Sequence, residues 1–213
     1  MLKTQEITAL AAMKSDRTCE NNKIYEIEKA LIDACSPTLA GVKVGNLFAC
    51  DFSSAREAAF HVDRIKCTLC RKNIGIRIVR WNGKRALIYV YRVDKLDEIM
   101  ADTKVREFMQ EKGYDFSGDC VSCLANRLAK GGREEICDFP HEIGVFLGYP
   151  LEDVLGYIEN KGRNSKLTGY WKVYGDANEA RRVFSCFKKC TEIYQRMYAA
   201  GKGIGQLAVG SRA

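Results

Sequence analysis

The sequence predicts an α+β fold in one domain, with a small mixed or antiparallel sheet built around a central hairpin and flanked by several helices. Three observations support this. The stretch IGIRIVRWNGKRALIYVYR reads as two strands joined at Asn82-Gly83, apolar residues at helical spacing stand before and after it, and 213 residues suffice for one ordinary core. We expect the domain to occupy 23–200, after a helix and polar linker over 1–22 and before a flexible tail over 201–213.

The segments at the start of the chain are predicted to be helical. Residues 4–14 and 23–35 carry apolar side chains at helical spacing, and the polar stretch SDRTCENNK separates them. Ser36 followed by Pro37 is a typical pair of N-cap and first-turn residue. We therefore expect a new short helix to begin there, with Cys35 directly before its first turn.

A strand near 47–52 and a further helix come next. Ser54 and Glu57 form a capping-box pattern, in which each side chain bonds the backbone N–H of the other residue at a helix start. An apolar stripe then predicts the buried face of this helix, made of Ala58, Val62, Ile65 and Leu69.

The hairpin is the clearest local pattern. Asn82-Gly83 suits the positive backbone angles of a type I′ turn, so two strands should pair around it. The predicted register pairs Trp81 with Lys84, Val79 with Ala86, and Ile78 with Leu87. One face should then carry Ile76, Ile78, Leu87, Tyr89 and Tyr91, and the other Val79, Ala86, Ile88 and Val90. Because both faces are apolar, the sheet should be covered on both sides.

Helices dominate the prediction for the second half. Three of them are expected over 93–101, 103–112 and 118–130. PLEDVLGYIENKG reads as a helix with Pro150 in its first turn and Gly162 at its end. The segment TGYWKVYG is expected to be one strand, and Asp176 with Glu179 should cap a long final helix.

The charge pattern gives little reason to expect a nucleic-acid partner. The chain has a net charge of +7, but its 34 basic and 27 acidic residues are mixed, as on a solvated surface. No apolar run approaches the length of a membrane span, and the start lacks the basic-then-apolar order of a secretion signal. We expect a cytoplasmic protein without a membrane partner.

Ten cysteines in a chain of this size indicate reduced thiols rather than a disulfide framework. Cys67 with Cys70 and Cys120 with Cys123 have the spacing of half a metal or iron-sulfur site, and Cys137 lies near the second pair. The other interpretation is burial, because each pair falls in or beside a predicted helix among apolar residues. Both interpretations stay open, and no cofactor is expected outright.

Cys35 is the candidate nucleophile. A thiol at a helix N-terminus has a lowered pKa, because the positive end of the helix dipole stabilises the thiolate. Lys43 and Asn46 follow on the next stretch and could orient an anionic substrate. The alternative is that Cys35 only ends one helix and packs.

FPHEIGVFLGYP holds the second part of the candidate site. His141 could act as a base for the thiol, because imidazole titrates near neutral pH, and Glu142 could adjust its pKa. The alternative is a histidine that bonds a turn shaped by the prolines and glycines of this motif. Lys172 in GYWKVYG is a further candidate contact for an anionic ligand.

Several motifs together resemble one family. They are CSPTLAG at 35–41, NLF at 46–48, FPHEIGVFLGYPLEDVLGYIENKG, GYWKVYG, and KCT at 189–191. The resemblance, over about residues 28–200, is to a bacterial family catalogued only as a domain of unknown function, number 3793. The family pattern includes the positions of Cys35, His141 and Glu142 but not the CxxC pairs. The resemblance implies an anaerobic, cytoplasmic setting and no particular activity.

Three hypotheses for function follow. The first is an intracellular domain that binds a small anionic ligand, or an enzyme of acyl or thiol transfer with Cys35 as nucleophile and His141 as base. The second is a metal or redox accessory protein that uses its CxxC cysteines. The third is a binding module for protein or nucleic acid.

Overall fold

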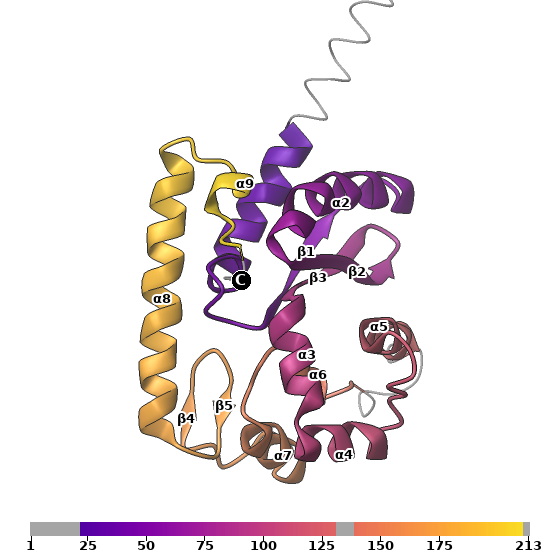
Figure 1. Cartoon of the computed structure of the whole chain (residues 1–213), viewed down its shortest axis with the longest axis vertical. Coiled ribbons are helices and arrows are strands. Elements are labelled where there is room, and N and C mark those ends of the chain that lie inside the picture. Colours follow the sequence, from indigo (N-terminus) through magenta and orange to yellow (C-terminus); the bar gives the residue numbers. More distant parts are fainter. Residues whose placement is uncertain (1–21, 131–138, 211–213) are drawn as a thin grey trace, which may run out of the picture.

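The computed structural model of the chain describes residues 22–130 and 139–210. Its first element is a helix described over 22–39, drawn in indigo in Figure 1. This helix continues through Ser36 and Pro37, so the prediction of a new helix at Ser36 is wrong. The Ser36 hydroxyl donates a hydrogen bond to the backbone carbonyl of Ile32, one turn earlier. Residues 35–39 are all buried, and this packing outweighs the backbone hydrogen bond that a proline cannot make inside a helix.

Three antiparallel strands form the sheet, in the order β1-β3-β2. They are β1 (Gly45–Asp51), β2 (Ile74–Asn82) and β3 (Arg85–Arg92). Between β1 and β2 the chain forms α2 (Ala55–Leu69) and the short 3-10 helix η1 (Cys70–Lys72). Ser54 caps α2 by accepting a hydrogen bond from the Glu57 backbone N–H, and the predicted stripe of α2 is buried. The predicted α+β fold with a small antiparallel sheet is confirmed.

The hairpin forms at the predicted place, but the predicted register is wrong. Asn82 pairs with Arg85, so the two-residue turn consists of Gly83 and Lys84. Of these two residues only Gly83 has a positive φ, of +65°. Glycine first with a single positive φ is typical of a type II′ turn, whereas a type I′ turn needs two positive angles.

A bulge at Val79 also changes which residues share a face of the sheet. Before the bulge, Ile76 lies opposite Val90 and Ile78 lies opposite Ile88. These isoleucines pack with β3 residues that the predicted register put on the other face, and Val79 packs on the opposite side. An extra residue in one strand reverses the side on which later side chains lie, and the hairpin sequence shows no clear mark of it.

Two hydrophobic clusters cover the two faces of the sheet, as predicted. The first joins the helix over 22–39 to α2 and to residues near the C-terminus. The second joins the other face of the sheet to α3 (Val93–Ala101), α4 (Thr103–Glu111), α5 (Cys120–Lys130), α6 (Ile143–Phe146) and α7 (Leu151–Glu159). The sheet is thus the layer between two helical layers.

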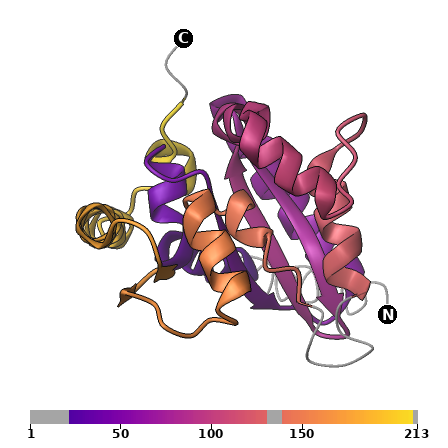
Figure 2. The same ribbon diagram turned by 90° about the horizontal axis from the view of Figure 1, so that it is seen from below.

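After α7 the chain forms a small hairpin and a long helix. β4 (Leu167–Thr168) and β5 (Lys172–Val173) pair antiparallel, where the sequence predicts one strand. α8 (Ala177–Ala199) begins at the predicted cap, Asp176, whose side chain accepts hydrogen bonds from two backbone N–H groups. Seen from below in Figure 2, α8 is nearly end-on at one side of the molecule.

The segment predicted to be a flexible tail over 201–213 packs on the domain as far as it is described. α9 (Ile204–Leu207) lies there, and Ile204 and Leu207 are buried in the first cluster. The Arg92 guanidinium donates a hydrogen bond to the backbone carbonyl of Val209, at 2.6 Å. Residues up to 210 therefore complete the core. The region 1–21 of the predicted N-terminal helix and linker lies outside the described residues.

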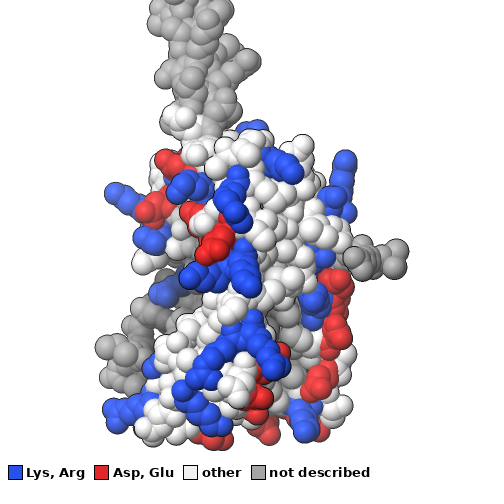
Figure 3. All heavy atoms as spheres, turned by 90° about the vertical axis from the view of Figure 1, so that its left-hand side faces the viewer, with Lys and Arg blue, Asp and Glu red and all other residues white. Residues whose placement is uncertain are grey.

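The surface over α8 carries charges of both signs. Figure 3, which faces this side, shows lysine and arginine side chains among acidic ones, with uncharged surface between them. The mixed charges of the sequence are thus also mixed in space on this face. Separately, none of the helices in the described part of the chain has the length and apolar composition needed to cross a bilayer.

Candidate functional site

Cys35 lies in the first hydrophobic cluster and has no exposed surface. Because the helix continues past it, Cys35 is not at a helix N-terminus, and the predicted cause of a low pKa is absent. Burial instead raises the pKa of the Cys35 thiol to about 12, although the nearby charge of Lys43 acts in the opposite direction. At neutral pH this thiol is protonated and is a poor nucleophile.

His141 and Glu142 stand side by side before α6, but their side chains have different surroundings. The exposed His141 ring lies against the ring of Tyr157 on α7, with 4.9 Å between centroids. The Glu142 side chain is buried, and its carboxylate accepts hydrogen bonds from Arg127 Nε at 2.8 Å and from the Tyr114 hydroxyl at 3.3 Å. Glu142 thus holds α5 to α6, and its described partners do not include His141.

A cavity of about 400 Å³ lies between α6, α7 and the β4–β5 hairpin. We call it the aromatic pocket, because five rings line it: Phe139, His141, Tyr149, Tyr157 and Trp171. The Tyr149 and Trp171 rings stack with 4.9 Å between centroids and 27° between planes. The pocket also contains Lys172, so two residues predicted for the site, His141 and Lys172, lie in one cavity.

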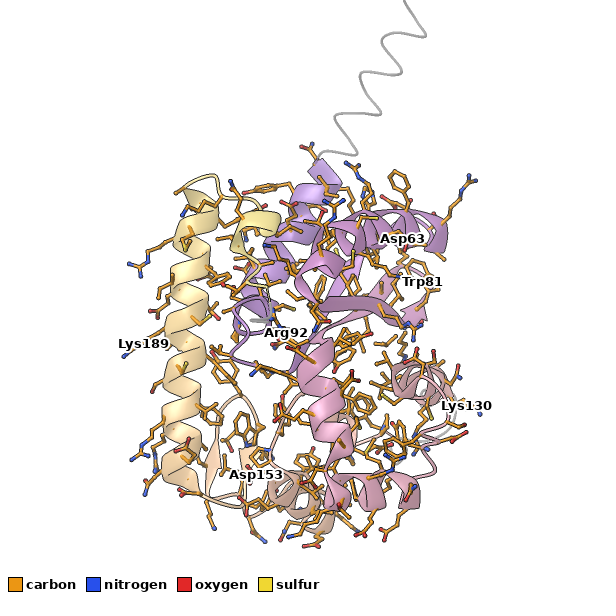
Figure 4. The ribbon with its side chains drawn as sticks, in the orientation of Figure 1. Asp63, Trp81, Arg92, Lys130, Asp153 and Lys189 are labelled. Carbon is orange, nitrogen blue, oxygen red and sulfur yellow. The ribbon has the colours of Figure 1, made fainter. Side chains whose placement is uncertain are left out.

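Asp153 holds one wall of the aromatic pocket in place. It is buried on α7, and its carboxylate accepts hydrogen bonds from Trp171 Nε1 at 2.6 Å and from the backbone N–H groups of Tyr174 and Gly175 at 2.6 and 2.8 Å. Figure 4 shows Asp153 where α7 meets the hairpin. Sequence analysis missed this residue, because an acid in the first turn of a helix is explained by the helix dipole alone.

Lys172 lies at the edge of the aromatic pocket. Its ammonium donates a hydrogen bond to the backbone carbonyl of Gly162 at 2.6 Å and lies 6.0 Å from the centroid of the Tyr157 ring. An ammonium has three N–H donors, so two remain after the bond to Gly162. No described carboxylate forms an ion pair with Lys172.

Lys43 and Asn46, the other predicted ligand contacts, lie elsewhere. Lys43 is buried and lines a second cavity of about 220 Å³, which we call the lysine cavity. Asp153 and Trp171 line both cavities, so the lysine cavity adjoins the aromatic pocket. The Asn46 side chain lines neither cavity, and its Oδ1 accepts a hydrogen bond from the Thr38 hydroxyl at 2.9 Å. The structure therefore separates the residues of the predicted site. His141 and Lys172 line the aromatic pocket, Lys43 lines the lysine cavity, and Cys35 lines neither.

The two CxxC pairs lie on opposite faces of the sheet. Cys67 and Cys70 are exposed at the end of α2, which packs on the first cluster, whereas Cys120 and Cys123 lie on α5 in the second. The pairs therefore cannot complete one metal site together. Within 22–130 and 139–210, no three histidine, cysteine or acidic side chains are grouped as metal ligands. Cys137 lies outside the described residues.

Comparison with known proteins bears on the whole domain. The profile of a family described as a protein of unknown function, DUF3793, matches residues 31–208 and so spans both cavities. No curated protein and no solved structure matches the chain. The match covers most of the chain and confirms the resemblance seen in the motifs. The chain belongs to this family of proteins of unknown function, DUF3793.

Proposed function

We propose that the protein binds a small aromatic ligand with a negatively charged group, and that the aromatic pocket is its site. The observation that carries this proposal is a cavity of about 400 Å³ with five aromatic side chains and one lysine around it. Pockets for small molecules are typically of this size, mostly apolar, with a few polar groups that fix the orientation of the ligand.

The arrangement of the rings supports a flat ligand. Tyr149 and Trp171 form one stacked wall, while His141 and Tyr157 meet at 57° with 4.9 Å between centroids. A planar ligand between these rings makes offset and edge contacts, each worth about 0.5–1.5 kcal/mol beyond the area it buries. An aliphatic ligand of equal size gains only the free energy of burying its apolar surface.

Lys172 supports a negative charge on the ligand. Its two remaining N–H donors can bond a carboxylate or phosphate, and a hydrogen bond to a charged group is worth about 1.5–3 kcal/mol. The carboxylate of Asp153 also lines the pocket, but its oxygens already accept three N–H bonds, which offset its charge. Lys172 is therefore the side chain that should make the pocket bind an aromatic carboxylate more tightly than the corresponding uncharged amide.

Binding of four simple probes tests the proposal: benzoate, indole-3-carboxylate, benzamide and butyrate. We expect the two aromatic acids to raise the thermal unfolding midpoint and to quench Trp171 fluorescence, which a Trp81→Phe variant isolates. Benzamide and butyrate should each bind about tenfold or more weakly, because each lacks one of the two interactions.

A matched pair of variants completes this experiment. Lys172→Met should lower the affinity for benzoate to the affinity for benzamide. Lys188→Met, at an exposed position on α8, should change the affinity for neither probe. Equal affinity for butyrate and benzoate would contradict the proposal, as would the failure of all four probes to bind at millimolar concentration.

The thiol-transfer form of the hypothesis gains no support from the site. Its nucleophile would be the Cys35 thiol, which is fully buried and has a raised pKa. Its base would be His141, which lines a cavity that Cys35 does not.

A further inference from the structure

The lysine cavity places a buried amine beside a small opening to solvent. Several of its lining residues are exposed, among them Glu152, Asp176 and Glu179, whereas the Lys43 side chain is 5% exposed. The Lys43 ammonium lies 5.3 Å from the centroid of the Tyr149 ring and 5.7 Å from that of Phe187. The amine thus sits at the inner, aromatic end of a cavity with charged groups at its mouth.

None of the described carboxylates forms an ion pair with Lys43. Its amine makes no hydrogen bond or ion pair within 22–130 and 139–210, although four carboxylate side chains line the same cavity: Glu152, Asp153, Asp176 and Glu179. Lysines as buried as Lys43 are rare unless they are paired, because removing an ammonium from water without an opposite charge is unfavourable. Packing alone does not account for an amine at this position.

We propose that Lys43 is a covalent site for small aldehydes or ketones, which enter the lysine cavity and form an imine with its side chain. This inference goes beyond the aromatic pocket and is independent of the ligand proposed there. In the reaction, the lone pair of the neutral amine attacks the carbonyl carbon and a C–N bond forms. The nitrogen loses two protons, the carbonyl oxygen takes both and leaves as water, and a C=N bond remains.

Burial also increases the fraction of Lys43 in the neutral form, which is the form that attacks a carbonyl carbon. Desolvation lowers the pKa of Lys43 to about 8, and only the thiolate form of Cys35 would act in the opposite direction. At pH 8 roughly half of such amines are neutral, compared with roughly 0.3% for a lysine with the ordinary pKa of about 10.5. Lys43 is therefore reactive where the exposed lysines are almost entirely protonated.

The charges around the lysine cavity favour a carbonyl compound over an anion. Glu152, Asp176 and Glu179 line its mouth, and Lys95 is the one other basic residue that the described lining includes. An anion would pass these carboxylates before it reached Lys43, whereas a neutral aldehyde is not repelled. The inner wall is apolar, with Phe187 against the amine.

Reductive trapping of the full chain tests the proposal. The folded protein is treated at pH 8 with limiting propanal and then with sodium borohydride, which reduces an imine to a stable secondary amine, and the modified peptides are identified by mass spectrometry. We expect Lys43 to be labelled about tenfold or more faster than the average exposed lysine. The preference should disappear in urea, where all lysines have similar pKa values.

Two variants and a competition with phosphate complete the test. Lys43→Met should remove the fast-labelled site while Lys95→Met, at the mouth of the same cavity, should retain it. Labelling in proportion to exposure, with Lys43 unlabelled in the folded chain, would overturn the proposal. Protection of Lys43 by millimolar phosphate would also overturn it, because this would identify an anion site. Failure of benzoate to bind, with Lys43 still labelled, would affect only the aromatic pocket.

Discussion

The two adjoining cavities differ in whether their buried charged side chains have hydrogen-bond partners. In the aromatic pocket, Asp153 accepts three hydrogen bonds and Lys172 donates one to a backbone carbonyl. In the lysine cavity, the Lys43 ammonium lies over the rings of Tyr149 and Phe187 and forms no ion pair with the described residues. Hydrogen-bond partners compensate a buried charge for its lost hydration, whereas a buried charge without partners lowers the stability of the fold and indicates a possible functional role. This difference supports our two proposals, noncovalent binding in the first cavity and a reactive amine in the second.

The largest expected effect concerns the Cys35 thiol beside Lys43. Its pKa of about 12, compared with an ordinary value of 9.0, lowers the thiolate fraction roughly 1,000-fold, and burial also blocks access. Iodoacetamide labelling of the folded protein at pH 8 should modify the exposed Cys67 and leave Cys35 unmodified until unfolding. Equal labelling rates at the two positions would restore the thiol-enzyme hypothesis.

The second prediction concerns the paired charge of the aromatic pocket. Asp153→Ala leaves three buried or half-buried N–H donors without their acceptor, so we expect the free energy of unfolding to fall by about 3 kcal/mol. Urea unfolding measures this loss. Glu152→Gln, at the adjacent exposed position, is the matched control and should change the stability by less than about 0.5 kcal/mol. Similar values for the two variants would mean that Asp153 does not hold the wall of the pocket.

The third and smallest predicted effect is a gain in stability rather than a loss. Lys43→Met should raise the free energy of unfolding at pH 7 by about 2 kcal/mol, because it removes an unpaired buried ammonium. The folded-state pKa of Lys43 is lowered to about 8 from 10.5, so the unfolded chain binds more protons between these values. The wild-type protein therefore gains stability from this group as the pH rises from 8 to 10.5, and the advantage of the variant shrinks over that range.

Urea unfolding of both proteins at pH 7 and pH 10 gives the two differences, in which other titrating groups largely cancel. A destabilised Lys43→Met variant at pH 7 would show that the ammonium has partners after all. The contrast between the two cavities would then be lost.

Local patterns account for the parts of the fold that were predicted correctly. The capping box at Ser54, the cap at Asp176 and the apolar stripe of α2 depend on residues at most a few turns apart, so the sequence shows them directly. The hairpin was located but given the wrong register, because a type II′ turn and the bulge at Val79 depend on how β3 packs between two clusters. The continuation of the helix through Pro37 also depends on tertiary packing, because the burial of residues 35–39 outweighs the local helix-start pattern of Ser36 and Pro37.

The sequence predicted only part of the arrangement of the candidate residues. His141 in FPHEIGVFLGYP and Lys172 in GYWKVYG lie in one cavity, and their role in function stays a prediction. Cys35 was placed in the wrong local structure, and the wall-forming role of Asp153 was missed, because its partners follow about twenty residues later in the chain.

The sequence by itself determined the α+β class, most helix boundaries, the place of the hairpin and the family, because these depend on spacing and on short motifs. Only the tertiary structure decided which charged groups are paired. Lys43 has no ion-pair partner among the described residues, and burial lowers its pKa because Tyr149 and Phe187, more than a hundred residues later, pack over it. Burial is a property of segments that meet in space, so the reactivity of a side chain cannot be deduced from its neighbours in sequence.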